Sequence, residues 1–148
     1  MSNILWQRGY SVQTIASPEF AWAYMTDVAH WDDPPAQFRL EGPFTTGGHG
    51  VTEVPGQPSR FWRLQDVRPI ERYTIDVALD RAALRFEWRF SSIAETHTCL
   101  SQCITLEGEN AAAYLTDVQQ AFASNLELGM KKIATTLDRA YSHSRLER

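Results

Sequence analysis

The sequence has no long apolar run and no excess of basic residues, and it has only two cysteines. A membrane-spanning helix needs about 18 or more consecutive apolar residues, and no stretch reaches that length. The formal net charge is -4, whereas a nucleic-acid or anionic-membrane partner favours a clustered basic patch. We therefore expect no membrane span and no nucleic-acid partner.

The two cysteines, Cys99 and Cys103, are four positions apart in a strand-like segment. On a regular strand they share a face but lie roughly 13 Å apart, and a disulfide needs Cα atoms within about 7 Å. Residues 1–10 contain no apolar run of signal-peptide length. Free thiols without a leader are typical of a reducing compartment, so we expect a cytoplasmic protein.

Motifs of covalent and metal catalysis are missing as well. The sequence contains neither a Gly-x-Ser-x-Gly elbow nor an HExxH pair. His97, Cys99 and Cys103 share a strand face, but neighbouring members are roughly 6.6 Å apart, while zinc ligands converge at about 2.0–2.3 Å from the metal. We predict no metal site, no cofactor and no covalent nucleophile.

Two histidine clusters have alternative interpretations. In His30-Trp31-Asp32-Asp33, a histidine beside two carboxylates could act as a general base, but the same pattern is typical of a capped, charged turn after a helix. His49 lies in a glycine-rich turn that no helix follows, which is unlike a phosphate-binding loop. We favour the structural interpretation for both and predict no catalytic residue.

Seven strand-like segments are distributed over residues 3–106 of the chain, which at 148 residues has the length of one domain. We predict strands at residues 3–14, 37–41, 50–54, 60–67, 73–79, 83–91 and 96–106. The segment from Leu84 to Phe90 alternates apolar residues with Arg85, Glu87 and Arg89. This alternation and the short connections between segments favour an antiparallel sheet with one buried and one solvated face.

Helices are predicted after the first strand and at the end of the chain. Ser17-Pro18-Glu19 is a helix start that leads to about Asp27, and a second helical turn follows at residues 28–31. Residues 109–141 are predicted to form one long helix, about 50 Å in length, with a frayed tail at 142–148. Its apolar stripe comprises Leu115, Val118, Phe122, Leu126, Gly129/Met130, Ile133, Leu137 and Tyr141.

This order of elements and several local motifs resemble a known superfamily. The motifs are Ser17-Pro18-Glu19-Phe20-Ala21-Trp22, Thr26-Asp27, His30-Trp31, Leu40-Glu41-Gly42-Pro43-Phe44 with Gly47-Gly48, and Leu126-Glu127-Leu128-Gly129-Met130 with Ile133 and Leu137. They resemble the START/SRPBCC superfamily, particularly its polyketide-cyclase/dehydrase-like and lipid-transport-like members. The resemblance covers nearly the whole chain. It implies an α+β helix-grip fold, in which a curved antiparallel sheet of about seven strands wraps around a long C-terminal helix.

The resemblance also implies an internal cavity that holds a hydrophobic or amphipathic small molecule. A single helix about 10 Å wide cannot fill the concave side of a strongly bent sheet, so we expect space between the two. The predicted ligand-binding residues are Tyr24, Trp31, Phe86, Trp88, Phe90, Thr98, Leu100, Gln102, Phe122, Leu126 and Met130. Gln102 shares strand parity with Leu100 and Ile104, and an inward amide needs a protein, water or ligand partner.

Gly129 is the one glycine inside the predicted terminal helix. A glycine there costs roughly 1 kcal/mol relative to alanine. It is either a tolerated surface glycine or a position that brings the helix close to the sheet or leaves room for a ligand. On the second interpretation, Gly129→Leu would block ligand binding while leaving the fold intact.

Three functions are consistent with this sequence. The first is binding or transport of a lipid, polyketide or aromatic metabolite in the cavity. The second is an enzyme resembling polyketide cyclases or dehydratases, in which the cavity would supply proximity and one polar side chain would move a proton. The third is an interaction module resembling co-chaperones, and a homodimer is left open. We rank binding first, because few acids or histidines are predicted to face inward.

Overall fold

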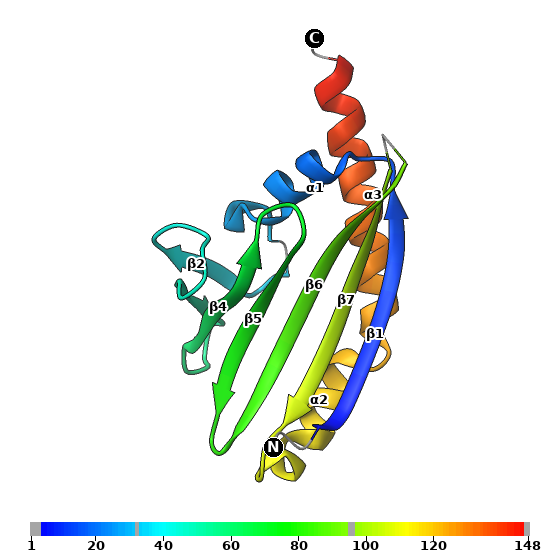
Figure 1. The fold of residues 1–148 in the computed structure, drawn as a ribbon. Helices are drawn as coiled ribbons and strands as arrows, with labels where there is room; N and C mark the ends of the chain where they lie inside the picture. The colour runs from blue at the N-terminus through cyan, green and yellow to red at the C-terminus, as the bar shows by residue number, and fades with distance from the viewer. Residues whose placement is uncertain (1–3, 32, 95–96, 147–148) are drawn as a thin grey trace.

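Seven strands form one antiparallel sheet, and the helices pack on one side of it (Figure 1). The computed structural model describes residues 4–31, 33–94 and 97–146. The sheet order is β1-β7-β6-β5-β4-β3-β2. The strands are β1 (Ile4–Thr14), β2 (Gln37–Glu41), β3 (His49–Glu53), β4 (Arg60–Arg68), β5 (Arg72–Leu79), β6 (Ala82–Ala94) and β7 (His97–Glu107). The α+β helix-grip prediction is confirmed.

All seven predicted strands are present, and their ends differ by only a few residues. The largest difference is in β6, which continues to Ala94 instead of ending at residue 91. Asn3 and Thr96, the first residues of two predicted strands, lie outside the described residues. Alternation and turn residues therefore located the strands well, because both depend on local sequence.

The first helix, α1 (Pro18–Met25), begins as its sequence indicates. The Ser17 hydroxyl accepts a hydrogen bond from the Phe20 backbone N–H at 3.2 Å, and Pro18 occupies the first turn. The short 3-10 helix η1 (Val28–His30) follows, capped by the Asp27 side chain, which accepts from the Ala29 N–H at 3.0 Å. The two short helices predicted after the first strand are thus confirmed.

The C-terminal helix differs from the prediction because it is interrupted. A 3-10 turn, η2 (Ala111–Tyr114), precedes α2 (Leu115–Phe122), and after a two-residue break at 123–124 the long helix α3 (Asn125–Leu146) begins. The Asn125 side chain donates to the Ala121 carbonyl at 3.1 Å. Asparagine and serine compete with the helical backbone for hydrogen bonds, which accounts for a break at residues 123–124, directly before Asn125.

The predicted frayed tail is largely helical. Helix α3 continues to Leu146, and residues 147–148 lie outside the described chain. The Ser144 hydroxyl donates to the Tyr141 carbonyl at 2.8 Å, and the Arg145 guanidinium donates to the Tyr141 hydroxyl at 3.0 Å. These side-chain bonds stabilise the last turns, whose polar sequence had indicated fraying. No helix in the described part of the chain is long and apolar enough to cross a membrane.

Strand register divides the sheet into two faces, which we call the inner face, toward the helices, and the outer face. One inner row runs Tyr73, Trp88, Gln102 and Tyr10 across β5, β6, β7 and β1, and the next row runs Leu64, Ile75, Phe86, Ile104 and Arg8. The buried core lies between this face and the helices, and includes Leu64, Leu100, Ile104, Leu106, Met130 and Leu137.

Helix α3 is attached at the β1 side of the sheet. One oxygen of Asp138, Oδ1, accepts from the Thr14 hydroxyl at 2.6 Å and from the Ile15 backbone N–H at 2.9 Å. Because α3 packs along the edge strand β1, the inner faces of β5 and β6 are left for α1 and α2 to cover.

Candidate functional site

The predicted site residues fall into a buried group and a half-buried group. Six of them lie on β6 and β7, and strand register places all six, Gln102 included, on the inner face. Trp88, Phe90, Thr98, Leu100, Leu126 and Met130 are buried, whereas Tyr24, Trp31, Phe86, Gln102 and Phe122 are half-buried. The second group retains most of the side-chain surface that a ligand could contact.

Three of the buried residues are packed on all sides. Thr98 and Leu100 have 0% exposed surface, so their side chains border neither solvent nor an open cavity, and Met130 keeps only 1%. The Thr98 hydroxyl also donates to the Ala16 carbonyl at 2.8 Å. In this structure these residues serve the core, and contact with a ligand would require rearrangement.

The half-buried aromatic pair lies between the sheet and α2. The rings of Phe86 on β6 and Phe122 on α2 meet edge to face, with centroids 5.3 Å apart. Ile75 pairs with Phe86 across β5 and β6, and Val77 is the next inward residue of β5. We call Ile75, Val77, Phe86 and Phe122 the inner patch; all four are half-buried and pack against the core.

Sequence reasoning missed the β5 members of the inner patch. Tyr73, Ile75, Val77 and Leu79 alternate with Thr74, Asp76 and Ala78, which is an inward and outward pattern. That alternation could have identified Ile75 and Val77 as inward residues, but their incomplete burial depends on where the helices pack.

Gln102 faces inward, as its strand parity predicted. Its register partners are Trp88 on β6 and Tyr10 on β1. The side chain is half-buried and makes no hydrogen bond to the described residues. It therefore presents an unpaired donor and acceptor beside the inner patch.

Tyr73 is a second inward polar group, which sequence reasoning assigned to no site. Its side chain is 1% exposed and is surrounded by aromatic rings, with centroids at 5.8 Å for Trp22, 4.9 Å for Phe44 and 6.2 Å for Trp88. The hydroxyl makes no hydrogen bond to the described residues. Burial raises the pKa of Tyr73 well above its usual range, so the phenol remains protonated and can donate.

Tyr24 and Trp31 lie apart from the inner patch, near α1 and η1. The Trp31 indole N–H donates to the Met25 carbonyl at 2.7 Å, and its ring lies 5.4 Å from that of Trp62. Tyr24 stacks on His30, with centroids 3.8 Å apart. Among the described aromatic pairs, neither ring contacts Phe86 or Phe122.

The His30 cluster has the structural arrangement that we favoured. His30 Nδ1 lies 2.9 Å from the Tyr24 carbonyl, and Asp27 Oδ2 is 3.9 Å from His30 Nε2. Asp27 caps η1, while Asp32 lies outside the described residues. One ring nitrogen is thus near the end of α1 and the other near the N-cap of η1, and His30 is exposed and separate from the inner patch.

The structure contradicts the interpretation that Gly129 brings the helix close to the sheet or leaves room for a ligand. It is exposed on α3, and no heavy atom lies within 4 Å of the point that a Cβ atom would occupy there. The apolar stripe passes through Met130 instead, which is 1% exposed. Gly129 therefore neither brings α3 close to the sheet nor leaves room for a ligand, and Gly129→Leu is not expected to block binding.

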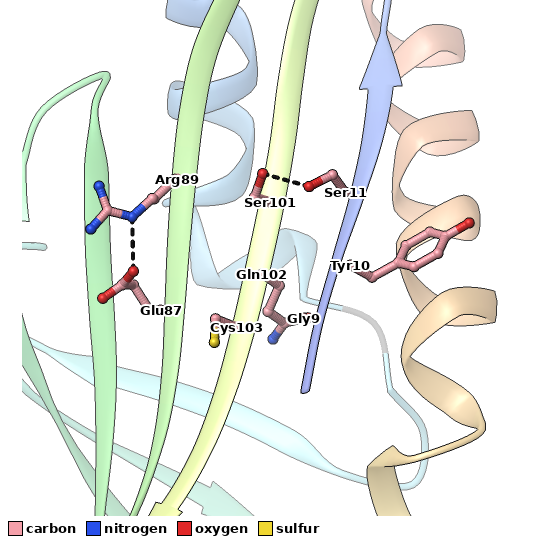
Figure 2. A pocket seen from close by; sticks show the side chains of 8 residues that line it. All are labelled: Gly9, Tyr10, Ser11, Glu87, Arg89, Ser101, Gln102 and Cys103. Atoms are coloured by element: carbon pink, nitrogen blue, oxygen red, sulfur yellow. Dashed lines mark hydrogen bonds and ion pairs between the residues drawn. The ribbon is translucent and has the colours of Figure 1, made fainter. Parts of the chain in front are cut away.

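The outer face carries a hollow of about 420 Å³, lined by residues 9–11 of β1, Glu87 and Arg89 of β6, and residues 101–103 of β7. Gln102 belongs to this lining, and its backbone carbonyl lies next to Gly9. Figure 2 shows its polar rim, where Ser11 and Ser101 are hydrogen-bonded at 2.8 Å and Arg89 pairs with Glu87 at 2.8 Å. Cys103 also lines it, and its sulfur accepts from the Gln7 amide at 3.2 Å. The hollow arises because Gly9 places no side chain between these groups.

The remaining outer face is charged and paired. Arg85 contacts the Glu107 carboxylate and lies 3.3 Å from Asp76 Oδ1, an oxygen that is buried and accepts no hydrogen bond. Arg39 and Glu53 pair at 3.1 Å across β2 and β3. This agrees with the predicted solvated sheet face. Within the described residues, no group of three or more His, Cys, Asp or Glu is arranged to hold a metal ion.

Comparisons with known proteins support the fold. No protein-family model and no curated protein matches the sequence. Among solved structures, norcoclaurine synthase from Thalictrum flavum has a TM-score of 0.68 at 10% identity, covering 93% of each chain. The Zhui aromatase/cyclase from a Streptomyces species has a TM-score of 0.68 at 13% identity, covering 94% of this chain and 95% of that one.

A third structure, from Rhodobacter sphaeroides, has a TM-score of 0.67 at 16% identity and covers 97% of this chain and 99% of that one. Norcoclaurine synthase has also been solved in complex with dopamine and hydroxybenzaldehyde. At these identities the comparisons establish a START/SRPBCC-type fold, as the sequence motifs indicated.

Proposed function

We propose that this protein binds a small hydrophobic or amphipathic molecule on the inner face, with the inner patch as the main contact. The observation that carries the proposal is the incomplete burial of Ile75, Val77, Phe86 and Phe122 on the side of the sheet that the helices cover. Apolar side chains left half-exposed beside a core gain about 25 cal/mol for each Å² that a ligand buries.

The structural neighbours support this class of ligand. Two of them are an aromatase/cyclase and a synthase solved in complex with dopamine and hydroxybenzaldehyde. Aromatic or polyketide-like molecules are therefore the first ligands to test. Small-molecule sites are commonly apolar with a few polar groups, and the inner patch with Gln102 has that composition.

Binding is favoured over a cyclase- or dehydratase-like reaction by the groups near the patch. A proton-transfer step needs an acid or base with a pKa near the working pH. The raised pKa of Tyr73 makes its phenol a hydrogen-bond donor rather than a base, and Gln102 does not titrate. Residence in the cytoplasm, a homodimer and a co-chaperone-like role remain predictions from the sequence.

The test is a fluorescence titration with N-phenyl-1-naphthylamine, a neutral apolar probe. Removing the Phe122 ring in Phe122→Ala should weaken binding at least about tenfold, because truncating an aromatic contact costs more than about 1.4 kcal/mol. The matched control is Phe61→Ala, since Phe61 is 72% exposed and its strand neighbour Trp62 occupies the inner face.

The control should bind the probe as tightly as the unmodified protein. Equal affinity for all three proteins, each shown by circular dichroism to be folded, would contradict the proposal. A second test is native mass spectrometry after gentle purification, where a retained apolar molecule is the expected result for a carrier.

A further inference from the structure

Two unpaired polar groups lie in one row beside the inner patch, and together they indicate what kind of ligand fits. The row Tyr73, Trp88 and Gln102 crosses β5, β6 and β7. Neighbouring strands are about 4.8 Å apart, so Tyr73 and Gln102 are separated by roughly 10 Å at the backbone, with Trp88 between them. The row containing Ile75 and Phe86 is two residues further along the strands, or roughly 7 Å.

We propose that the Tyr73 hydroxyl and the Gln102 amide form the polar end of the ligand site and select a neutral aromatic ligand that carries a hydroxyl or carbonyl oxygen. This inference rests on the proposed function, and it adds the chemical class of the ligand and two residues that determine specificity. The apolar body of the ligand would contact the inner patch, and its oxygen would bond to the polar row.

The first support is that the Tyr73 hydroxyl is unpaired. The side chain is 1% exposed, and the hydroxyl bonds to none of the described residues. The hydroxyl is not one of the fully buried unpaired atoms, since Asp76 Oδ1 is the one such atom in the described part of the chain, so the small surface that Tyr73 keeps includes its hydroxyl. An unpaired phenol with a little accessible surface can donate to a ligand oxygen.

The second support is the lack of a counter-charge in the polar row itself and among the rings that enclose Tyr73. Tyr73 is enclosed by Trp22, Phe44, Trp88 and Phe90. The one cation in the two inner rows is Arg8, which is exposed on the edge strand β1, three strands away from Tyr73. An ionised carboxylate would lose its hydration there without a charged partner, whereas a phenol or ketone would gain hydrogen bonds at smaller cost.

Three naphthalene derivatives of matched shape test this selectivity at neutral pH. With the unmodified protein, 2-naphthol should bind about 3–10-fold more tightly than naphthalene, the gain expected from one hydrogen bond. The anion 2-naphthoate should bind more weakly than 2-naphthol by at least about tenfold. Naphthoate binding as tightly as naphthol would overturn the inference.

Tyr73→Phe removes the hydroxyl and keeps the ring. The ratio of naphthol to naphthalene affinity should fall to about 1, while naphthalene affinity stays unchanged and the melting temperature is equal or higher. Gln102→Leu provides a second variant, with a smaller decrease in the same ratio. The control is Tyr141→Phe, because the Tyr141 hydroxyl bonds to Arg145 on α3 instead, and its ratio should match the unmodified protein.

An unchanged ratio in both Tyr73→Phe and Gln102→Leu, with naphthalene still bound and still weakened by Phe122→Ala, would overturn this inference and leave the proposed function standing. If none of the three probes binds, the proposed function itself fails, and this inference fails with it. The two failures are therefore distinguishable.

Discussion

The two faces of the sheet satisfy their polar groups in opposite ways. On the outer face, charged residues of neighbouring strands pair with one another, as Arg85 does with Glu107 and Arg39 with Glu53. Asp76 Oδ1 accepts no hydrogen bond there, but it lies 3.3 Å from the Arg85 guanidinium. On the inner face, Tyr73 and Gln102 have no partner among the described residues, and they lie next to apolar side chains that are only half-buried. A face whose charged groups pair with one another needs no ligand. A face with unpaired polar groups and half-buried apolar side chains gains stability when a suitable molecule binds.

The largest expected effect is on the free energy of unfolding, and it distinguishes the buried side of α3 from its exposed side. Leu137 is 0% exposed and faces the core, while Leu128 on the same helix is 67% exposed. Leu137→Ala should lower the free energy of unfolding by about 2–5 kcal/mol, since it removes buried methyl groups and leaves a cavity. Leu128→Ala should change it by less than about 0.5 kcal/mol. Urea unfolding of both variants would measure this, and similar losses would contradict the placement of α3.

A somewhat smaller effect is expected from breaking the outer-face network. Glu107 has a 7% exposed side chain and contacts Arg85, so Arg85→Ala would leave a buried carboxylate unpaired. We expect a loss of about 3 kcal/mol, the lower end of the range for buried pairs, because Arg85 itself is 42% exposed.

The control for this pair is Arg89→Ala. Arg89 pairs with Glu87 on the same face, but both side chains are exposed, at 52% and 42%. Exposed pairs contribute about 0–1 kcal/mol, so this variant should unfold at nearly the original urea concentration. A loss for Arg89→Ala as large as that for Arg85→Ala would show that burial does not distinguish the two pairs.

Much of the fold was predictable because its determinants are local. The alternation in β6 identified the inner face, and Ser17-Pro18 located the start of α1. The break before α3 was missed because the three- and four-residue spacing of the apolar stripe continues through it, from Phe122 to Leu126. A side-chain hydrogen bond such as that of Asn125 leaves no periodic signal.

The site was less predictable than the fold. The alternation of side chains along β7 correctly predicted that Gln102 faces inward. It could not show which inward residues would be fully packed, because that depends on how α1, α2 and α3 lie over the sheet. Tyr73 illustrates this: its alternation indicates an inward side chain, yet only the structure shows a hydroxyl without a partner. The prediction for Gly129 was wrong because positions 129 and 130 both fit the spacing of the apolar stripe of the terminal helix.

Gly129→Ala provides a smaller test, with the opposite sign. Because Gly129 is exposed and a Cβ there would meet no other atom within 4 Å, alanine should stabilise the protein by about 0.5–1 kcal/mol through its higher helix propensity. Thermal unfolding would measure the gain, and binding of N-phenyl-1-naphthylamine should not change. A destabilised variant, or one that binds the probe more weakly, would mean that this side of α3 faces the site after all.

The smallest effect is expected from Asp66, on the exposed bulge of β4. Its hydrogen bond from Arg72 at 2.7 Å, aided by Arg68, lowers the pKa of the carboxyl below its usual 3.8. A lowered pKa stabilises the folded state above pH 3.8, and this stabilisation is lost as the pH falls through the folded-state pKa. Asp66→Asn should therefore be slightly less stable at pH 7 and equal at strongly acidic pH, and a difference that grows on acidification would contradict the assignment.

The central claim is that an apolar molecule binds between the helices and the sheet, and methyl NMR tests it most directly. Ile75 faces inward in the inner patch, whereas Ile4, Ile15, Ile70 and Ile93 are 38–52% exposed at other positions. In a titration of protein labelled at isoleucine methyl groups with naphthalene, we predict that the Ile75 signal shifts in a saturable manner and that these four stay in place. Shifts confined to the four exposed isoleucines, or no shift at Ile75 at saturating naphthalene, would contradict the account.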